Sequence, residues 1–202
     1  MTNRMVTNRT LPRLGAACGA LFAVPLFAVS GNSGHVNVIG LAAFALFLPF
    51  LAYLYSLLRE AEGANGWLST TAFAAGLTGI TIKLLSAAPE IANRHVTDDT
   101  PLHKALQGIA DAATGISLYP LAVMFAAITV LTFRTSVLPR WLGFGAAATA
   151  IALAVMGSFI GRNAGPALIL FVLWTLVASV VLFRRTWREP TQVARPYSPA
   201  AS

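Results

Sequence analysis

The sequence has few charged residues and a single cysteine. Only 10% of its 202 residues are charged, whereas 56% are hydrophobic. A soluble domain has about 25% charged residues, and so few charges could not cover the surface of a water-soluble fold of this size. The one cysteine, Cys18, cannot form an intrachain disulfide or a CxxC redox pair, and it suits a small packing residue. These shortages exclude an ordinary soluble domain and a disulfide-stabilised one.

Familiar catalytic and ligand-binding motifs are missing as well. The chain has no GxSxG elbow, HExxH helix, P-loop or Rossmann glycine pattern. No histidine lies deep in an apolar run, where it would ligate haem. We therefore predict no cofactor, and no metal as the leading interpretation. The net charge of +7 does not indicate nucleic-acid binding, because the basic residues are scattered at segment ends and tails rather than gathered beside stacking aromatics.

What the chain does have is long apolar runs. About 20 residues of helix cross the ~30 Å hydrocarbon core of a bilayer. Only helices and closed barrels satisfy their backbone in lipid, and these runs lack the alternation of barrel strands. We predict an all-α, polytopic transmembrane bundle of six helices joined by short, turn-rich links, without a separate soluble domain. The six segments run from about Leu14 to Ser30, Val36 to Leu58, Trp67 to Ala88, Leu106 to Phe133, Trp141 to Ile160 and Pro166 to Phe183.

The basic residues predict the orientation, because loops on the cytoplasmic side carry more Lys and Arg. Lys83 lies within a span, and the other basic residues divide ten to three between the two sides. The richer side holds Arg4, Arg9, Arg13, Arg59, Arg134, Arg140, Arg184, Arg185, Arg188 and Arg195, and the poorer side Arg94, Lys104 and Arg162. We therefore expect both termini in the cytoplasm, as a short segment 1–13 before the transmembrane domain 14–184 and a basic, largely disordered tail 185–202. The tail is expected to contact anionic lipid headgroups.

Two interpretations of the first segment stay open. A basic region, an apolar run and the Ala28-x-Ser30 pair before Gly31 resemble a signal peptide, whose cleavage would leave five helices in the same orientation. The spacing of Gly15, Gly19 and Ala23 instead favours a packing helix, because small residues let helices approach closely. Small-residue faces of this kind are also where a second copy or a membrane partner would pack.

The stretch Leu138-Pro139-Arg140-Trp141-Leu142-Gly143 opens a late helix. It resembles a motif in a bacterial family of multi-helix membrane proteins of this length and of unknown function. The segment Ile80–Glu90 is similar to hypothetical membrane proteins of high-GC bacteria. The resemblance implies a bacterial inner-membrane protein and supplies no activity or binding residues. An echo of the stretch at Leu11–Gly15 is explained either by a duplication or by two independent helix starts, at which proline is favoured.

Two charged residues, Lys83 and Asp111, lie within the predicted third and fourth spans. Lys83 is 16 residues after Trp67, about 24 Å along the third helix, and Asp111 is 23 residues before Arg134, about 34 Å along the fourth. Because these helices are sequential and antiparallel, we expect the two charges to meet near the outer leaflet. Charged residues in a span are costly and are candidates for function.

Further polar residues share helical spacing with these charges. Gly76, Gly79, Ser86 and Glu90 fall on the face of Lys83. The candidate polar pocket comprises Lys83, Asp111, Gln107, His103, Glu90 and Thr114. Three interpretations stay open: a snorkelling Lys83 beside a solvated Asp111, a structural ion pair between two helices, or a working site.

The loop between the third and fourth segments offers His95, Asp98, Asp99 and His103. Mixed histidine and carboxylate ligands are acceptable to zinc, but the spacing matches no known signature. A pair of histidines could also sense pH. An ordinary solvated loop is the simplest interpretation.

The sequence therefore favours a non-enzymatic envelope, scaffold or sensor protein. One alternative is a carrier or channel for a small solute, with Lys83 and Asp111 as its binding or gating charges. Another is an intramembrane enzyme acting on a lipid or isoprenoid, with Asp111 as general acid. No second carboxylate within the spans accompanies Asp111 to complete a catalytic pair.

Overall fold

The computed structural model describes residues 14–23, 38–64, 66–93, 96, 100–158 and 165–188, and of residues 38–42 and 186–188 it describes the backbone only. The helices are Leu14–Ala23, α2 (Val38–Glu62), α3 (Trp67–Leu85), α4 (Ala87–Asn93), α5 (Pro101–Thr135), α6 (Arg140–Ser158) and α7 (Gly165–Arg188). The described residues form helices and turns, without strands, as predicted.

Five of these helices are long and apolar enough to span a membrane: α2, α3 with α4, α5, α6 and α7. This finding confirms a multi-pass, all-α protein by length and composition. The first predicted span, from about Leu14 to Ser30, is described only over Leu14–Ala23, which is a shorter apolar helix, and the rest of it lies outside the described residues. The α7 helix runs to Arg188 and so includes residues 185–188 of the segment predicted as a tail.

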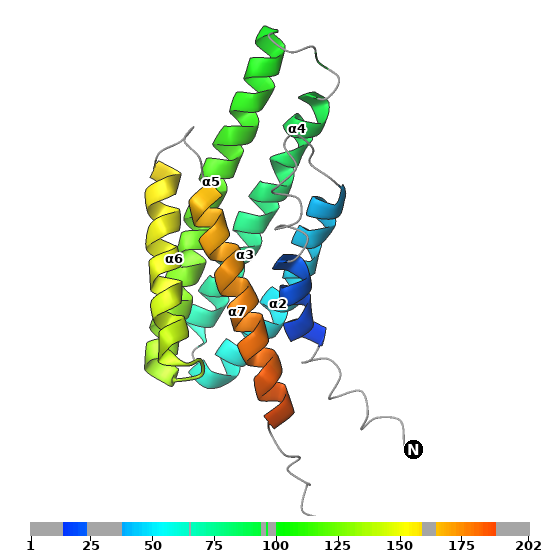
Figure 1. Cartoon of the computed structure of the whole chain (residues 1–202). Helices are drawn as coiled ribbons and strands as arrows, with labels where there is room; N and C mark the ends of the chain where they lie inside the picture. The colour runs from blue at the N-terminus through cyan, green and yellow to red at the C-terminus, as the bar shows by residue number, and fades with distance from the viewer. Residues whose placement is uncertain are drawn as a thin grey trace, which may run out of the picture.

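The helices pack side by side around α5, which contacts α2, α3, α4 and α6 (Figure 1). Aromatic rings fill the centre: Phe125 of α5 lies edge-on to Phe171 and Trp174 of α7, with ring centroids 5.8 and 4.9 Å apart. Phe22 and Phe47 bring the first helix and α2 into the same cluster. Such edge-to-face pairs add to the packing that holds helices together in lipid.

The stretch that opens α6 has a structural role. Ser136 ends α5 in the left-handed region at φ 53°, and Leu142 N donates to Pro139 O at 2.9 Å, which closes the turn into α6. The buried indole Nε1 of Trp174 then donates to Leu142 O at 3.0 Å and ties α7 to this turn. These contacts give Pro139 and Leu142 of the stretch a structural role.

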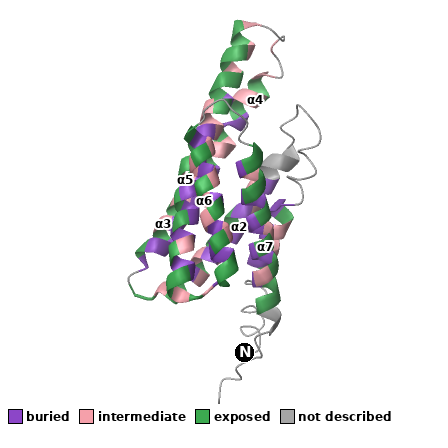
Figure 2. Cartoon of the chain, turned by 60° about the vertical axis from the view of Figure 1, so that its left-hand side comes forward, coloured by how far each residue is buried: buried purple, intermediate pink, exposed green. Residues whose placement is uncertain are grey.

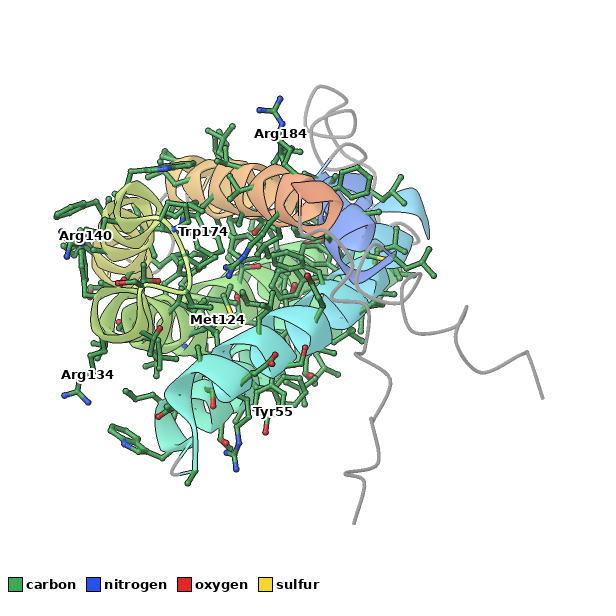
Figure 3. All side chains as sticks on the ribbon, turned by 90° about the horizontal axis from the view of Figure 1, so that it is seen from below. Tyr55, Met124, Arg134, Arg140, Trp174 and Arg184 are labelled. Carbon is green, nitrogen blue, oxygen red and sulfur yellow. The ribbon has the colours of Figure 1, made fainter. Side chains whose placement is uncertain are left out.

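The α5 helix has 35 residues, about 52 Å at 1.5 Å per residue, which exceeds the ~30 Å hydrocarbon core. Its first turns rise with α4 beyond the ends of the other helices (Figure 1), and exposed residues dominate there (Figure 2). We call α4 with residues 101–112 of α5 the projecting hairpin. At the opposite end of the bundle, Arg134, Arg140 and Arg184 point outward around the rim (Figure 3).

Candidate functional site

The contact between α3 and α5 positions the predicted polar residues. Gly76 and Gly79 of α3 are buried against Met124 and Leu121 of α5. A Cβ atom on Gly79 would lie 2.7 Å from Leu121 Cγ and 3.2 Å from Ser117 O. Only glycine allows the two backbones to come this close, so the face of α3 that carries Lys83 is held against α5, as its spacing predicted.

Lys83 makes a direct hydrogen bond across this contact. Its Nζ donates to Thr114 Oγ1 of α5 at 2.8 Å, and both side chains are half-buried. The buried Ser86 hydroxyl donates to Lys83 O at 2.7 Å where α3 ends. The lysine is therefore fixed between two helices by a polar contact rather than extended freely along the surface.

Asp111 does not form the direct ion pair that its predicted depth suggested. Its side chain is exposed, and within the described part of the chain the Lys83 ammonium is bonded to Thr114 instead. The physical reason is depth. Thr114 lies 20 residues before Arg134, about 30 Å from that end, and is thus closer than Asp111 to the ~24 Å level of Lys83. Asp111 lies about one helical turn farther out, within the projecting hairpin.

Asp111 and Glu90 both lie on the hairpin side of Lys83. Asp111 is exposed on α5, three residues before Thr114. Glu90 is half-buried on α4, seven residues beyond Lys83, and α4 packs against α5. One ammonium group and two carboxylates therefore follow one another along the contact of α3 and α4 with α5.

The remaining predicted residues lie farther along the hairpin. Gln107 is exposed and His103 is half-buried in the first turns of α5. The His103 backbone N–H donates to Thr100 Oγ1 at 3.2 Å, so Thr100 caps the helix. We call Lys83, Thr114, Asp111, Glu90, Gln107 and His103 the polar seam, which runs from the α3–α5 contact outward along the hairpin.

The metal hypothesis receives no geometric support from the part of the chain that the structure describes. There, no three His, Cys, Asp or Glu side chains gather closely enough to hold an ion. His95, Asp98 and Asp99, on which the hypothesis mainly depended, lie outside the described residues. Of its four residues only His103 is placed.

One polar contact was not predicted. Glu62, at the end of α2, reaches across the turn and accepts hydrogen bonds from Leu68 N at 3.0 Å and Ser69 N at 2.8 Å with its two carboxylate oxygens. Arg59 donates to Gly66 O at 2.8 Å and fills the space beside Gly66, whose φ is +36°. Gly66 is the N-cap residue of α3 and has no side chain to cap the helix. A glycine at this position was the available sign that another residue supplies the cap.

Most buried serine and threonine side chains of the described bundle form hydrogen bonds with nearby backbone carbonyls. Six of the seven buried serines and threonines donate to carbonyls of their own helices or adjoining turns: Ser69, Ser86, Ser117, Thr132, Thr149 and Thr175. The seventh, Ser179, lies against Gly19. The described core therefore presents side-chain packing rather than a line of open polar groups.

Comparison with known proteins found no matching family model, no matching curated protein and no matching solved structure.

Proposed function

We propose that the chain is a non-enzymatic, multi-pass protein of the bacterial inner membrane that acts as an envelope scaffold or sensor, with both termini in the cytoplasm. The observation that carries this proposal is the closed core. Among the described residues, six of the seven buried hydroxyl groups bond to nearby backbone carbonyls, and aromatic rings fill the centre. A carrier needs polar groups at the midplane that can exchange partners with a solute.

The distribution of charge supports the orientation. Arg59, Arg134 and Arg140 lie at one end of the helices, as do Arg184 and Arg185. Lys83 and Lys104 lie towards the other end. The positive-inside rule then places the arginine-rich end in the cytoplasm and the projecting hairpin outside.

The projecting hairpin is the surface through which a scaffold or sensor would work, because it extends beyond the length that the bilayer requires. It combines exposed polar residues such as Gln107 with exposed apolar residues such as Leu102 and Ile109. We propose that partners in the envelope are contacted here. The small-residue faces proposed for association are used within the chain at Gly15, Gly19 and Gly79, which makes them less available to a second copy.

The experiment is complementation in a strain in which the gene is deleted and an envelope phenotype has been scored. One variant replaces residues 87–108 by a short Gly-Ser link, which removes most of the hairpin and leaves the spans. A second carries Asp111→Asn, and Glu60→Gln is the matched control at the opposite end. A scaffold should lose complementation with the shortened hairpin and keep it with Asp111→Asn. The reverse result, at equal protein levels, would support a carrier or an enzyme and reject the proposal.

A solute-flux measurement separates the remaining alternatives. Purified protein in liposomes should conduct protons and small solutes no faster than protein-free liposomes do. A flux that disappears with Lys83→Met or Asp111→Asn would identify a carrier or channel. Turnover of a membrane lipid that requires Asp111 would identify an enzyme.

A further inference from the structure

The polar seam has unused hydrogen-bonding capacity near one end of the membrane-spanning helices. An ammonium group has three N–H donors, and within the described residues Lys83 uses one of them, on Thr114. The Asp111 and Glu90 carboxylates lie on the hairpin side of Lys83, on α5 and α4, and accept no hydrogen bond from another residue that the structure describes. A charged group near the hydrocarbon boundary is stabilised when it pairs with a group of opposite charge or with a hydrogen-bonding group.

The charges are ordered along the helix axes. Asp111 lies three residues from Thr114 towards the hairpin, about 4.5 Å, and Glu90 lies seven residues beyond Lys83, about 10 Å along α3 and α4. Figure 1 shows α4 continuing in the direction of α3. The positive charge is therefore nearer the middle of the bundle, and both negative charges lie nearer the projecting end.

This order is complementary to one class of ligand. In an aminophospholipid the phosphate is attached to the glycerol at the hydrocarbon boundary, and the ammonium group is the terminal part of the headgroup. We propose that the polar seam binds a phosphoethanolamine headgroup, with its phosphate on Lys83 and Thr114 and its ammonium on Asp111 and Glu90. Charge-assisted hydrogen bonds would form at both ends.

The same arrangement disfavours the other common headgroups. A purely anionic headgroup would gain from Lys83 and be repelled by the two carboxylates. A choline headgroup carries the same charges, but its quaternary ammonium has no N–H to donate to Asp111 or Glu90. A simple cation would gain from the two carboxylates, but it would be repelled by Lys83 and would leave that ammonium group without an anionic partner. The seam therefore selects a zwitterion that has hydrogen-bond donors at its positive end.

This inference does not depend on the scaffold proposal, because it is tested by binding rather than by complementation. Purified protein in detergent is offered equimolar phosphatidylethanolamine, phosphatidylcholine and phosphatidylglycerol, and the retained lipids are measured by native mass spectrometry. We expect phosphatidylethanolamine to be retained preferentially. Loss of one charge-assisted hydrogen bond with Lys83→Met, or with Asp111→Asn, should weaken its binding about tenfold.

Controls and milder variants keep the test decisive. Arg140→Met and Glu60→Gln remove exposed charges at the opposite end and should leave the lipid preference unchanged. Thr114→Val removes only a hydroxyl group and should weaken binding less than Lys83→Met does. This milder variant keeps the test valid if Lys83→Met fails to fold. Equal retention of the three lipids, or variants that bind as the unmodified chain does, would overturn the proposal.

Free phosphoethanolamine separates a lipid site from a solute site, since both carry the same chemistry. For a lipid site, the free compound should displace phosphatidylethanolamine only at concentrations far above those of the lipid. If the free compound binds tightly and the lipid does not, the seam is a small-solute site and the lipid assignment is wrong. In that case the flux measurement described above becomes the deciding test of function.

Discussion

Lys83 and Thr114 join α3 to α5 through a hydrogen bond of 2.8 Å between Nζ and Oγ1. The bond lies beside the glycine contact that brings these two helices together. It replaces a direct ion pair with Asp111 and so changes which pair of substitutions should be coupled.

We predict that Lys83→Met and Thr114→Val are coupled in a double-mutant cycle. Either change alone removes the interhelical bond, whose contribution to the free energy of unfolding is about 1.5–3 kcal/mol for a charged donor. The double variant should therefore lose less than the sum of the two single losses. Thermal unfolding in detergent, followed by tryptophan fluorescence, measures each term.

The corresponding cycle with Asp111→Asn should show a smaller coupling, because the described hydrogen bond of Lys83 is to Thr114 and not to Asp111. Thr81→Val is the control, since Thr81 is exposed on α3 and bonds to its own helix at Leu77 O. A stronger coupling of Lys83 to Asp111 than to Thr114 would show that the ion pair forms and that the Thr114 bond does not persist in the membrane.

Hydropathy predicted the long helices because a bilayer fixes the length of an apolar segment. It placed their ends less well. The fourth segment was predicted to start at Leu106, whereas α5 starts at Pro101 with Thr100 as its cap. Thr100-Pro101 is a helix-start signal that hydropathy does not detect. The third segment was predicted to end at Ala88, whereas α3 ends at Leu85 and α4 continues to Asn93.

The candidate site was predicted in part for a similar reason. The spacing of Gly76, Gly79 and Lys83 correctly indicated a face of α3 that packs inward. The partner of Lys83 depends on the axial offset between α3 and α5. The contacts of the α3 glycines with Leu121 and Met124 determine this offset. A register shift of one helical turn exchanges Asp111 for Thr114. Sequence spacing alone does not resolve a shift of that size.

Glu62 should stabilise the turn between α2 and α3. Its carboxylate accepts two backbone N–H groups at the start of α3, and loss of a helix cap costs about 0.5–2 kcal/mol. Glu62→Ala should lower the free energy of unfolding by about this amount, and Glu60→Ala, an exposed neighbour, should not. SDS-induced unfolding of the two variants checks the difference. Equal stability would mean that water replaces the cap at no cost.

The orientation predicts which ends of the bundle react with a membrane-impermeant thiol reagent. In a Cys18→Ser background, Ala105→Cys reports the projecting hairpin and Ala64→Cys reports the turn between α2 and α3. Both positions are exposed, and neither change alters the count of basic residues. We expect Ala105→Cys to react in intact cells and Ala64→Cys to react only after permeabilisation. The opposite pattern would invert the topology and place the hairpin in the cytoplasm.

The first helix packs inside the bundle through Gly19. A Cβ atom on Gly19 would clash with Ser179 Oγ of α7 and lie 2.6 Å from Phe50 Cδ2 of α2. The Ser179 hydroxyl is buried and, within the described residues, has no hydrogen-bond partner. Close contact with Gly19 explains why a small residue is needed on both helices. We therefore expect this segment to be retained in the folded protein and not cleaved as a signal peptide.

Gly19→Leu should therefore destabilise the bundle, because overpacking a tight contact costs about 1–3 kcal/mol. Ser179→Ala removes a buried hydroxyl group that has no hydrogen-bond partner among the described residues, so it should leave stability unchanged or raise it. Combined with Gly19→Ala in one chain, it should recover part of the stability that Gly19→Ala loses. Gly108→Ala is the matched control: its Cβ meets nothing within 4 Å, so helix propensity should raise stability by about 0.5–1 kcal/mol. Thermal unfolding in detergent measures all these variants. If Gly19→Leu unfolds at the same temperature as the unmodified chain and an N-terminal tag is lost from the mature protein, the first segment is a cleaved signal peptide.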